Sequence, residues 1–233
     1  VLKNETKKVE AYIGSQNFND SEFQGQVDGA NSIRSPGSTL KPFIFGLAFD
    51  KGILTPKMVI EDIPTNFDGY APTNFDEKFN GLVTVEKSLA FSLNIPAVKT
   101  IEQLTPKAFT NVLVKSGFKQ IKRDYNHLGL SVALGGCGVT LEELTHMYSI
   151  FSQKGMLYNY PVLESDTSQY AVRILSEPSS YMVSEILTQL VRPDLPNNMQ
   201  SSFHVPHIAW KTGTSFGRKD PWCVGYNRTY LIG

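Results

Sequence analysis

The stretch STLKPFIFGLAFDK, residues 38–51, contains the longest apolar patch of this 233-residue chain. Its apolar residues recur at the three- and four-residue spacing of one helix face: Leu40, Phe43, Ile44 and Leu47. Gly52 follows where a C-terminal cap is expected, and Pro42 is tolerated if the first turn begins near Ser38. The sequence therefore predicts a helix over residues 38–51.

Further helices are predicted in the middle of the chain, where caps precede helical spacing. They cover residues 84–91, 96–104, 105–117, 140–155 and 177–191. The clearest start is Thr140-Leu141-Glu142-Glu143, which has the form of a capping box. Residues 15–37 and 53–83 are rich in Gly, Asn, Asp and Pro, and we expect them to be irregular.

Strands are predicted at both ends, where apolar and polar residues alternate. They lie in residues 2–14 (two strands and a polar turn), 207–211, 222–226 and from Tyr230 onward. Hairpins at both ends with helices between them favour an α+β fold within the broad α/β class. The expected architecture is an antiparallel sheet with helices packed on it, rather than a βαβ series.

Composition excludes several classes of protein. The formal net charge is zero, with 22 basic and 22 acidic residues and no basic block, so no nucleic-acid partner is expected. No apolar run approaches the roughly 18–20 residues that span a bilayer, and Val1 opens no signal peptide. Cys137 and Cys223 form no C-x-x-C pair and have no His at zinc-ligand spacing, so we expect two small buried residues and neither metal nor cofactor.

Three short motifs carry the candidate chemistry: Ser38-Thr39-Leu40-Lys41, Ser92-Leu93-Asn94 and Lys211-Thr212-Gly213-Thr214. The first two are weak alone, because each has a second copy, at residues 116–119 and 15–17. Context separates the copies. Ser38 and Lys41 share one helix face, whereas Gly117 is expected to end the helix between Ser116 and Lys119. Ser92 and Asn94 lie in a gap between helices, whereas residues 15–17 lie in a polar loop.

These residue types suit nucleophilic catalysis. The Ser38 hydroxyl is a poor nucleophile until a base removes its proton. Lys41 can be that base if it is neutral, which burial or a second cation such as Lys211 would favour. Ser92 can pass a proton between Lys41 and a leaving amine. Asn94 can fix Lys41 or bind a substrate carbonyl.

The third motif is expected on a strand whose edge binds an extended peptide. Gly213 removes a side chain where that peptide would approach. The hydroxyls of Thr212 and Thr214, together with Lys211, suit a substrate carboxylate. The backbone N–H groups of Ser38 and Thr214 are candidates for an oxyanion hole.

The S-x-x-K, S-x-N and K-T-G set is a signature of penicillin-binding proteins and class A β-lactamases. The flanking residues resemble the transpeptidase domain of bifunctional class A penicillin-binding proteins over nearly the whole chain. The resemblance rests on four segments: RSPGSTLKP (34–42), VTVEKSLAFSLNIPAV (83–98), LGG (134–136) before the helix with Thr145, and KTGTS (211–215). Asp220-Pro221-Trp222 and Gly225-Tyr226 follow the last of these.

The resemblance implies a five-stranded sheet in which the strand after Tyr230 is central. It implies that Ser38 attacks the penultimate D-Ala carbonyl of a peptidoglycan stem peptide and releases the terminal D-Ala. The amine of a neighbouring stem then resolves the acyl-enzyme, and β-lactams acylate Ser38 lastingly. Ser215 joins Thr212, Gly213 and Thr214 among the substrate-binding residues.

The resemblance also implies a setting for residues 1–233. We expect them to be an incomplete transpeptidase domain, truncated before a closing C-terminal helix. An N-terminal membrane anchor and a glycosyltransferase domain would lie outside the chain. The whole protein would work at the extracytoplasmic face of the bacterial cytoplasmic membrane, in the periplasm.

Other functions remain open at this point. A β-lactamase shares the motifs but needs a base for fast hydrolysis, and the chain has no familiar deacylation motif; Glu142 and Glu143 fit a capping role better. A non-transferring β-lactam sensor or scaffold and a carboxypeptidase side activity are further alternatives. His204 and His207 flank the third motif, and this chemistry needs neither.

Overall fold

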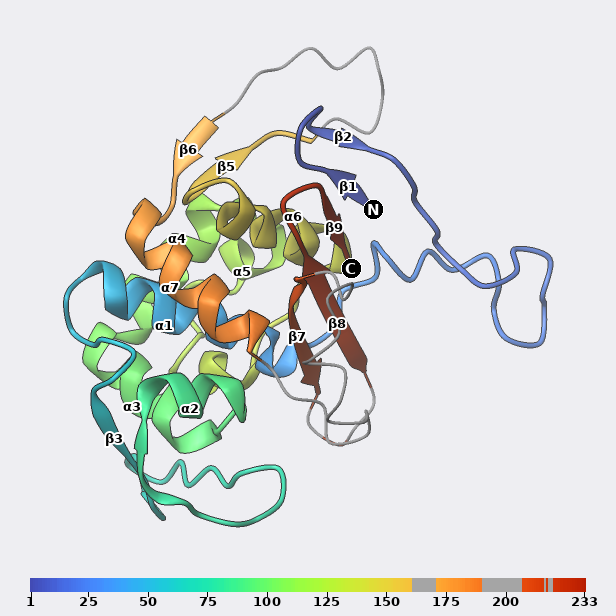
Figure 1. The fold of residues 1–233 in the computed structure, drawn as a ribbon. Helices are drawn as coiled ribbons and strands as arrows, with labels where there is room; N and C mark the ends of the chain where they lie inside the picture. The colour runs from blue at the N-terminus through green and yellow to red at the C-terminus, as the bar shows by residue number, and fades with distance from the viewer. Residues whose placement is uncertain (161–170, 190–206, 216, 218–219) are drawn as a thin grey trace, which may run out of the picture.

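The computed structural model describes residues 1–160, 171–189, 207–215, 217 and 220–233. Its largest sheet has five antiparallel strands in the order β2-β1-β9-β8-β7. The strands are β1 (Leu2–Lys3), β2 (Lys8–Val9), β7 (Ala209–Thr214), β8 (Pro221–Tyr226) and β9 (Tyr230–Ile232). Figure 1 shows the two ends of the chain meeting in this sheet, with the helices to one side. The predicted α+β fold and the central position of the strand from Tyr230 are confirmed.

Helix α1 (Lys41–Asp50) forms the centre of the helical layer. Every residue from Lys41 to Phe49 is buried, and burial of each large apolar side chain contributes about 1.5–3 kcal/mol. The expectation that one face of this helix is apolar was too narrow. Apolar residues surround the helix, because α3 (Asn94–Leu104) and α7 (Glu177–Thr188) both pack on it. The first turn, η1 (Gly37–Leu40), is a tighter 3₁₀ turn that precedes Pro42.

The other predicted helices are present with shifted ends. They are α2 (Val85–Ala90), α3, α4 (Pro106–Lys115), α6 (Leu141–Ser152) and α7. Two further short elements were not predicted: α5 (Lys119–Arg123) and η2 (Leu130–Leu134). Thr140 and Glu143 form the expected capping box at α6. Residues 190–191 of the last predicted helix lie outside the described residues. In the part of the chain that the structure describes, no helix has the length and apolarity to cross a membrane.

The expectation that residues 53–83 are irregular was wrong for residues 59–62 and 81–83. β3 (Val59–Asp62) and β4 (Gly81–Thr84) form an antiparallel pair in which Asp62 lies opposite Gly81. β3 alternates between exposed and buried residues, but one of its two buried positions holds the carboxylate Asp62, which hides the usual apolar signal of a strand. A second small sheet, β5 (Met156–Tyr158) with β6 (Ala171–Arg173), was also not predicted.

Turn η1 and strand β7 touch backbone to backbone at two glycines. A Cβ atom on Gly213 would lie 2.5 Å from the carbonyl oxygen of Pro36. A Cβ on Gly37, which has a positive φ of 52°, would lie 2.4 Å from the carbonyl oxygen of Thr214. Side chains at these positions would force the nucleophile turn away from the strand.

We expect Gly213→Ala to lower the free energy of unfolding by about 1–3 kcal/mol, the usual cost of overpacking. Gly225→Ala is the matched control on the neighbouring strand β8, because the nearest atoms to its Cβ would lie at 3.7 Å, an ordinary van der Waals distance. Urea unfolding of both variants measures the difference. Equal stability of the two variants would show that η1 and β7 do not depend on this close approach.

Candidate active site

All three predicted motifs meet at one place in the structure. Ser38 lies in η1 and Lys41 begins α1. Ser92 lies in the turn between α2 and α3, and Asn94 begins α3. Lys211 extends from β7. Three parts of the chain that are far apart in the sequence therefore supply the candidate catalytic residues.

Lys41 is the best enclosed of these residues, with no exposed surface. Its Nζ donates hydrogen bonds to Asn94 Oδ1 at 2.5 Å, to the Ser92 carbonyl oxygen at 2.6 Å and, at 3.5 Å, to Ser92 Oγ. Burial, together with the nearby charge of Lys211, holds the pKa of Lys41 well below its usual range, while Asp62 acts in the opposite direction. Lys41 is thus a buried amine with a strong tendency to be neutral.

Lys211, which extends from β7, also contacts Ser92. Its side chain is almost fully buried, and its Nζ donates to Ser92 Oγ and to the Thr212 carbonyl oxygen, each at 2.8 Å. Burial lowers the pKa of Lys211 to about 7. Ser92 Oγ therefore bridges two lysines, and each of them is easier to deprotonate than a lysine in water.

The backbone of Ser92 is held in an unusual conformation. Its φ is +57°, in the left-handed region that residues other than glycine seldom adopt. Two backbone hydrogen bonds fix this turn, from Ser92 N to Leu89 O and from Leu93 N to Ser88 O. The tight turn directs both the carbonyl and the hydroxyl of Ser92 toward Lys41, which is the kind of local strain found at functional sites.

Ser38 is half-buried one turn before Lys41. The Lys41 backbone N–H donates to the Ser38 carbonyl oxygen, and residues three apart on a 3₁₀ turn share one face. Tyr148 steadies the turn, because its hydroxyl donates to the Thr39 carbonyl oxygen at 2.6 Å. Across the described residues, no hydrogen bond engages the Ser38 hydroxyl. Ser38 is thus free to meet a substrate.

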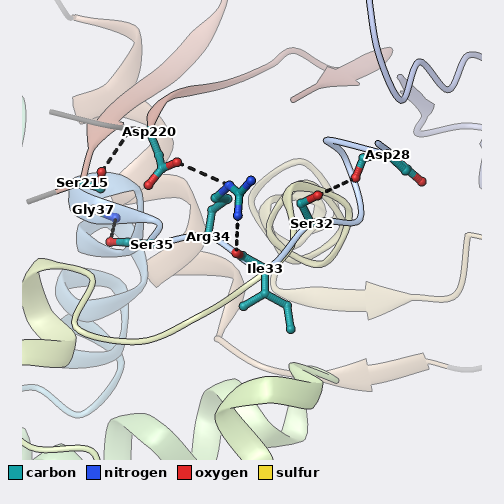
Figure 2. Close-up of polar contacts among 8 residues, drawn as sticks. All are labelled: Asp28, Ser32, Ile33, Arg34, Ser35, Gly37, Ser215 and Asp220. Atoms are coloured by element: carbon teal, nitrogen blue, oxygen red, sulfur yellow. Dashed lines mark hydrogen bonds and ion pairs between the residues drawn. The ribbon is translucent and has the colours of Figure 1, made fainter. Parts of the chain in front are cut away.

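The segment that precedes Ser38 is tied to the turn that follows β7. Arg34 Nε lies 3.5 Å from Asp220 Oδ1, and the Asp220 backbone N–H donates to Ser215 Oγ at 2.9 Å (Figure 2). Ser35 Oγ donates to the Gly135 carbonyl oxygen at 2.7 Å. The ion pair is partly exposed and contributes at most about 1 kcal/mol, so its main effect is on geometry.

The predicted substrate-binding residues differ in exposure. Thr212 and Thr214 are exposed on β7, which lies at the edge of the five described strands. Ser215 is buried, and its hydroxyl accepts the hydrogen bond from Asp220. Gly213 is also buried, and a Cβ atom at this position would point at Pro36 and Thr39. The protein's own packing therefore requires this glycine, a reason that sequence reasoning missed.

Sequence reasoning also missed three residues behind Asn94. The Asn94 backbone N–H donates to Asn74 Oδ1 at 2.7 Å, and Asn74 Nδ2 donates in turn to the Asp62 carboxylate. Asn80 donates to the same carboxylate. These residues lie in the region expected to be irregular. No local sequence pattern marked them, because Val59-Ile60-Glu61-Asp62 lacks the apolar-polar alternation of a half-buried strand.

The second S-x-x-K is split as expected, because Ser116 Oγ donates to Val112 O in α4 and Lys119 begins another helix. The expectation that both cysteines are buried was wrong: Cys137 is half-buried and Cys223 is exposed on β8. His207 is exposed, and His204 lies outside the described residues.

Comparison with known proteins gives a consistent result. The family model "Penicillin binding protein transpeptidase domain" matches residues 1–229. Penicillin-binding protein 1C of Escherichia coli K12 is 36% identical over 233 residues, covering all of this chain and 30% of that protein. Penicillin-binding protein 1F of Bacillus subtilis 168 is 27% identical over 97% of the chain and 32% of its own length. The chain thus spans about a third of the length of these relatives. From residues 26–30, leading to Arg34, a likeness to penicillin-binding protein 1C was expected, and that protein is among the relatives found.

Two solved structures share the fold. Penicillin-binding protein 1A from Haemophilus influenzae aligns with a TM-score of 0.72 at 23% identity, over 87% of this chain and 38% of that one. The transpeptidase domain of Burkholderia pseudomallei penicillin-binding protein 3 aligns with a TM-score of 0.69 at 21% identity, over 86% of this chain and 69% of that one. With the family model matching 229 of 233 residues, the chain belongs to the penicillin-binding protein transpeptidase domain family.

Proposed function

We propose that this chain is a serine-type D-Ala-D-Ala transpeptidase that cross-links peptidoglycan stem peptides through an acyl-enzyme on Ser38. The observation that carries the proposal is the arrangement around Lys41. A fully buried amine lies one turn after a half-buried serine and is hydrogen-bonded to Ser92 and Asn94, with Lys211 across Ser92. This arrangement supplies a nucleophile, a base that is readily neutral and a hydroxyl that relays protons.

In the acylation step, neutral Lys41 takes the proton from Ser38 Oγ as this oxygen attacks the penultimate D-Ala carbonyl. The tetrahedral oxyanion is held by the backbone N–H groups of Ser38 and Thr214. The contact of Gly37 with the Thr214 backbone supports this pairing. Collapse of the intermediate breaks the peptide bond, and Ser92 passes the proton from Lys41 to the leaving amine of D-Ala. Each such oxyanion donor typically contributes about 3 kcal/mol.

The second step reverses these roles. The amine of a neighbouring stem attacks the acyl-enzyme and loses its proton through Ser92 and Lys41, and Ser38 is regenerated. Water in place of the amine would give a carboxypeptidase side activity. We assign the donor's terminal carboxylate to Lys211, Thr212 and Thr214, with the main chain of Gly213 and Ser215 along the extended peptide.

No observation favours a β-lactamase. The Glu143 carboxylate accepts hydrogen bonds from the backbone N–H groups of Thr140 and Lys119, so it caps helices instead of activating water. We further propose that the whole protein works on peptidoglycan outside the cytoplasmic membrane and that β-lactams acylate Ser38. An anchor and a glycosyltransferase domain in the rest of the protein stay predictions.

Benzylpenicillin should form one lasting covalent adduct with the protein, and the Ser38→Ala variant should form none. Intact-mass spectrometry over time measures both. An adduct on Ser38→Ala would place the nucleophile elsewhere, and rapid loss of the wild-type adduct would favour a β-lactamase.

Lys41→Met should slow acylation by about 10²–10⁴-fold, the usual contribution of a general base. The apolar replacement introduces no new buried charge, so the fold should persist. Lys119→Met is the matched control, because Lys119 belongs to the second S-x-x-K and begins the separate helix α5. The second-order rate constant with benzylpenicillin measures both variants, and similar rates for the two would exclude Lys41 as the base.

The rate of acylation should fall on the alkaline side as Lys211 loses its proton. The pKa of Lys211 is about 7, so its positive charge, which attracts the carboxylate of penicillin, is present below this pH and lost above it. Lys211→Arg keeps the charge at all accessible pH values. It should therefore abolish the alkaline fall in the acylation rate, whatever its effect on the maximal rate. An alkaline limb that persists near pH 7 in Lys211→Arg would assign it to another group.

A further inference from the structure

Asp62 is a fully buried carboxylate at the end of β3. Its hydrogen bonds within the described residues all come from amides. Asn74 Nδ2 lies 2.9 Å from both carboxylate oxygens, and Asn80 donates its backbone N–H at 2.9 Å and its Nδ2 at 2.7 Å. A buried charge is costly unless it is well hydrogen-bonded, so this arrangement keeps a negative charge inside the protein.

Hydrogen bonds connect Asp62 to the candidate base. Asn74 donates to Asp62 and accepts the backbone N–H of Asn94 at 2.7 Å. The carbonyl oxygen of the neighbouring Thr73 accepts Asn94 Nδ2 at 2.6 Å. The amide of Asn94 is thereby oriented with its oxygen toward Lys41 Nζ, at 2.5 Å. The orientation of Lys41 thus depends on a loop that Asp62 holds in place.

Asp62 also acts on Lys41 through its charge. The charged groups that act on Lys41 are Lys211 from β7 and Asp62 from β3, and their effects are opposite in sign. Burial and Lys211 lower the pKa of Lys41, whereas Asp62 raises it. Asp62 is therefore the negative charge that acts on Lys41, although no ion pair joins the two in the described structure.

We propose that Asp62 is a positioning residue of the transpeptidase site, which holds Lys41 against Ser92 through Asn74 and Asn94 and supplies a negative charge that acts on Lys41. The inference rests on the proposed function. It extends the site beyond the three motifs to a carboxylate on β3 that touches neither Ser38 nor Lys41. A carboxylate needed only for folding would leave the pH dependence of acylation unchanged.

The test measures the rate of acylation by a fluorescent penicillin across pH, per acylable molecule, in the protein that contains this chain. Asp62→Asn should lower the rate about tenfold, because small displacements of catalytic groups are costly. It should also move the acid limb of the pH-rate profile, where Lys41 becomes protonated, to lower pH. The reason is that loss of the negative charge lowers the pKa of Lys41. Asn74→Ala cuts the hydrogen-bonded connection but keeps the charge, so it should lower the rate without moving this limb.

Glu61→Gln is the matched control. Glu61 is the neighbour of Asp62 on β3, faces the exposed side and pairs with Lys99 at 2.9 Å. Its rate and pH profile should equal those of the wild-type protein, so any change in Asp62→Asn reflects the buried position.

The outcomes separate the two proposals. Absence of a wild-type adduct would overturn the proposed function and, with it, this inference. If the wild-type protein is acylated and Asp62→Asn leaves the acid limb unchanged, the inference alone is overturned. This holds even if a smaller fraction of the Asp62→Asn molecules can be acylated. If Asp62→Asn gives no acylable protein, Asn74→Ala decides: a lower rate per acylable molecule supports the positioning role, and a wild-type rate overturns it.

Discussion

The burial of Lys41 is the constraint on which the rest of the site depends. An ammonium group removed from water loses several kcal/mol of solvation, and the usual remedy in proteins is a carboxylate in contact. Lys41 instead has the neutral oxygens of Ser92 and Asn94. These oxygens accept hydrogen bonds from either protonation state of the amine but do not hold its proton as a carboxylate would. The fold thus gives up some stability for an amine that can act as a base.

This enclosure explains why the catalytic groups come from distant parts of the chain. A single helix cannot bury its own first side chain, so α1 supplies Lys41, the turn before α3 covers it from one direction, and β7 brings Lys211 from another. The close contacts of Gly37 and Gly213 then fix η1 against β7. The same contacts that bury the base place the nucleophile beside the strand edge, so folding and preorganisation of the site have one physical origin.

Sequence patterns predicted those parts of the molecule that local chemistry decides. The Thr140 and Glu143 capping box and the spacing of Ser38 and Lys41 depend only on near neighbours. The resemblance to a known family then supplied the five-stranded sheet, which pairs strands from opposite ends of the chain. Local patterns failed where tertiary contacts decide: α1 is apolar on all sides because helices cover it, and Asp62 is buried because Asn74 and Asn80 donate to it. A local pattern shows neither the helices that cover α1 nor the asparagines that bind Asp62.

The separation between Asp62 and Lys41 has a physical rationale of its own. A carboxylate in direct contact with Lys41 would raise the pKa of the amine strongly and keep it protonated, and a protonated lysine cannot accept the proton of Ser38. With no negative charge nearby, burial and Lys211 would make the amine so weak a base that its driving force for proton transfer would fall. The amides of Asn74 and Asn94 stand between the two groups. Through these hydrogen bonds Asp62 orients Lys41, while the added distance weakens the electrostatic effect of its charge on the amine. Lys41 thus stays neutral enough to accept a proton and basic enough to remove one.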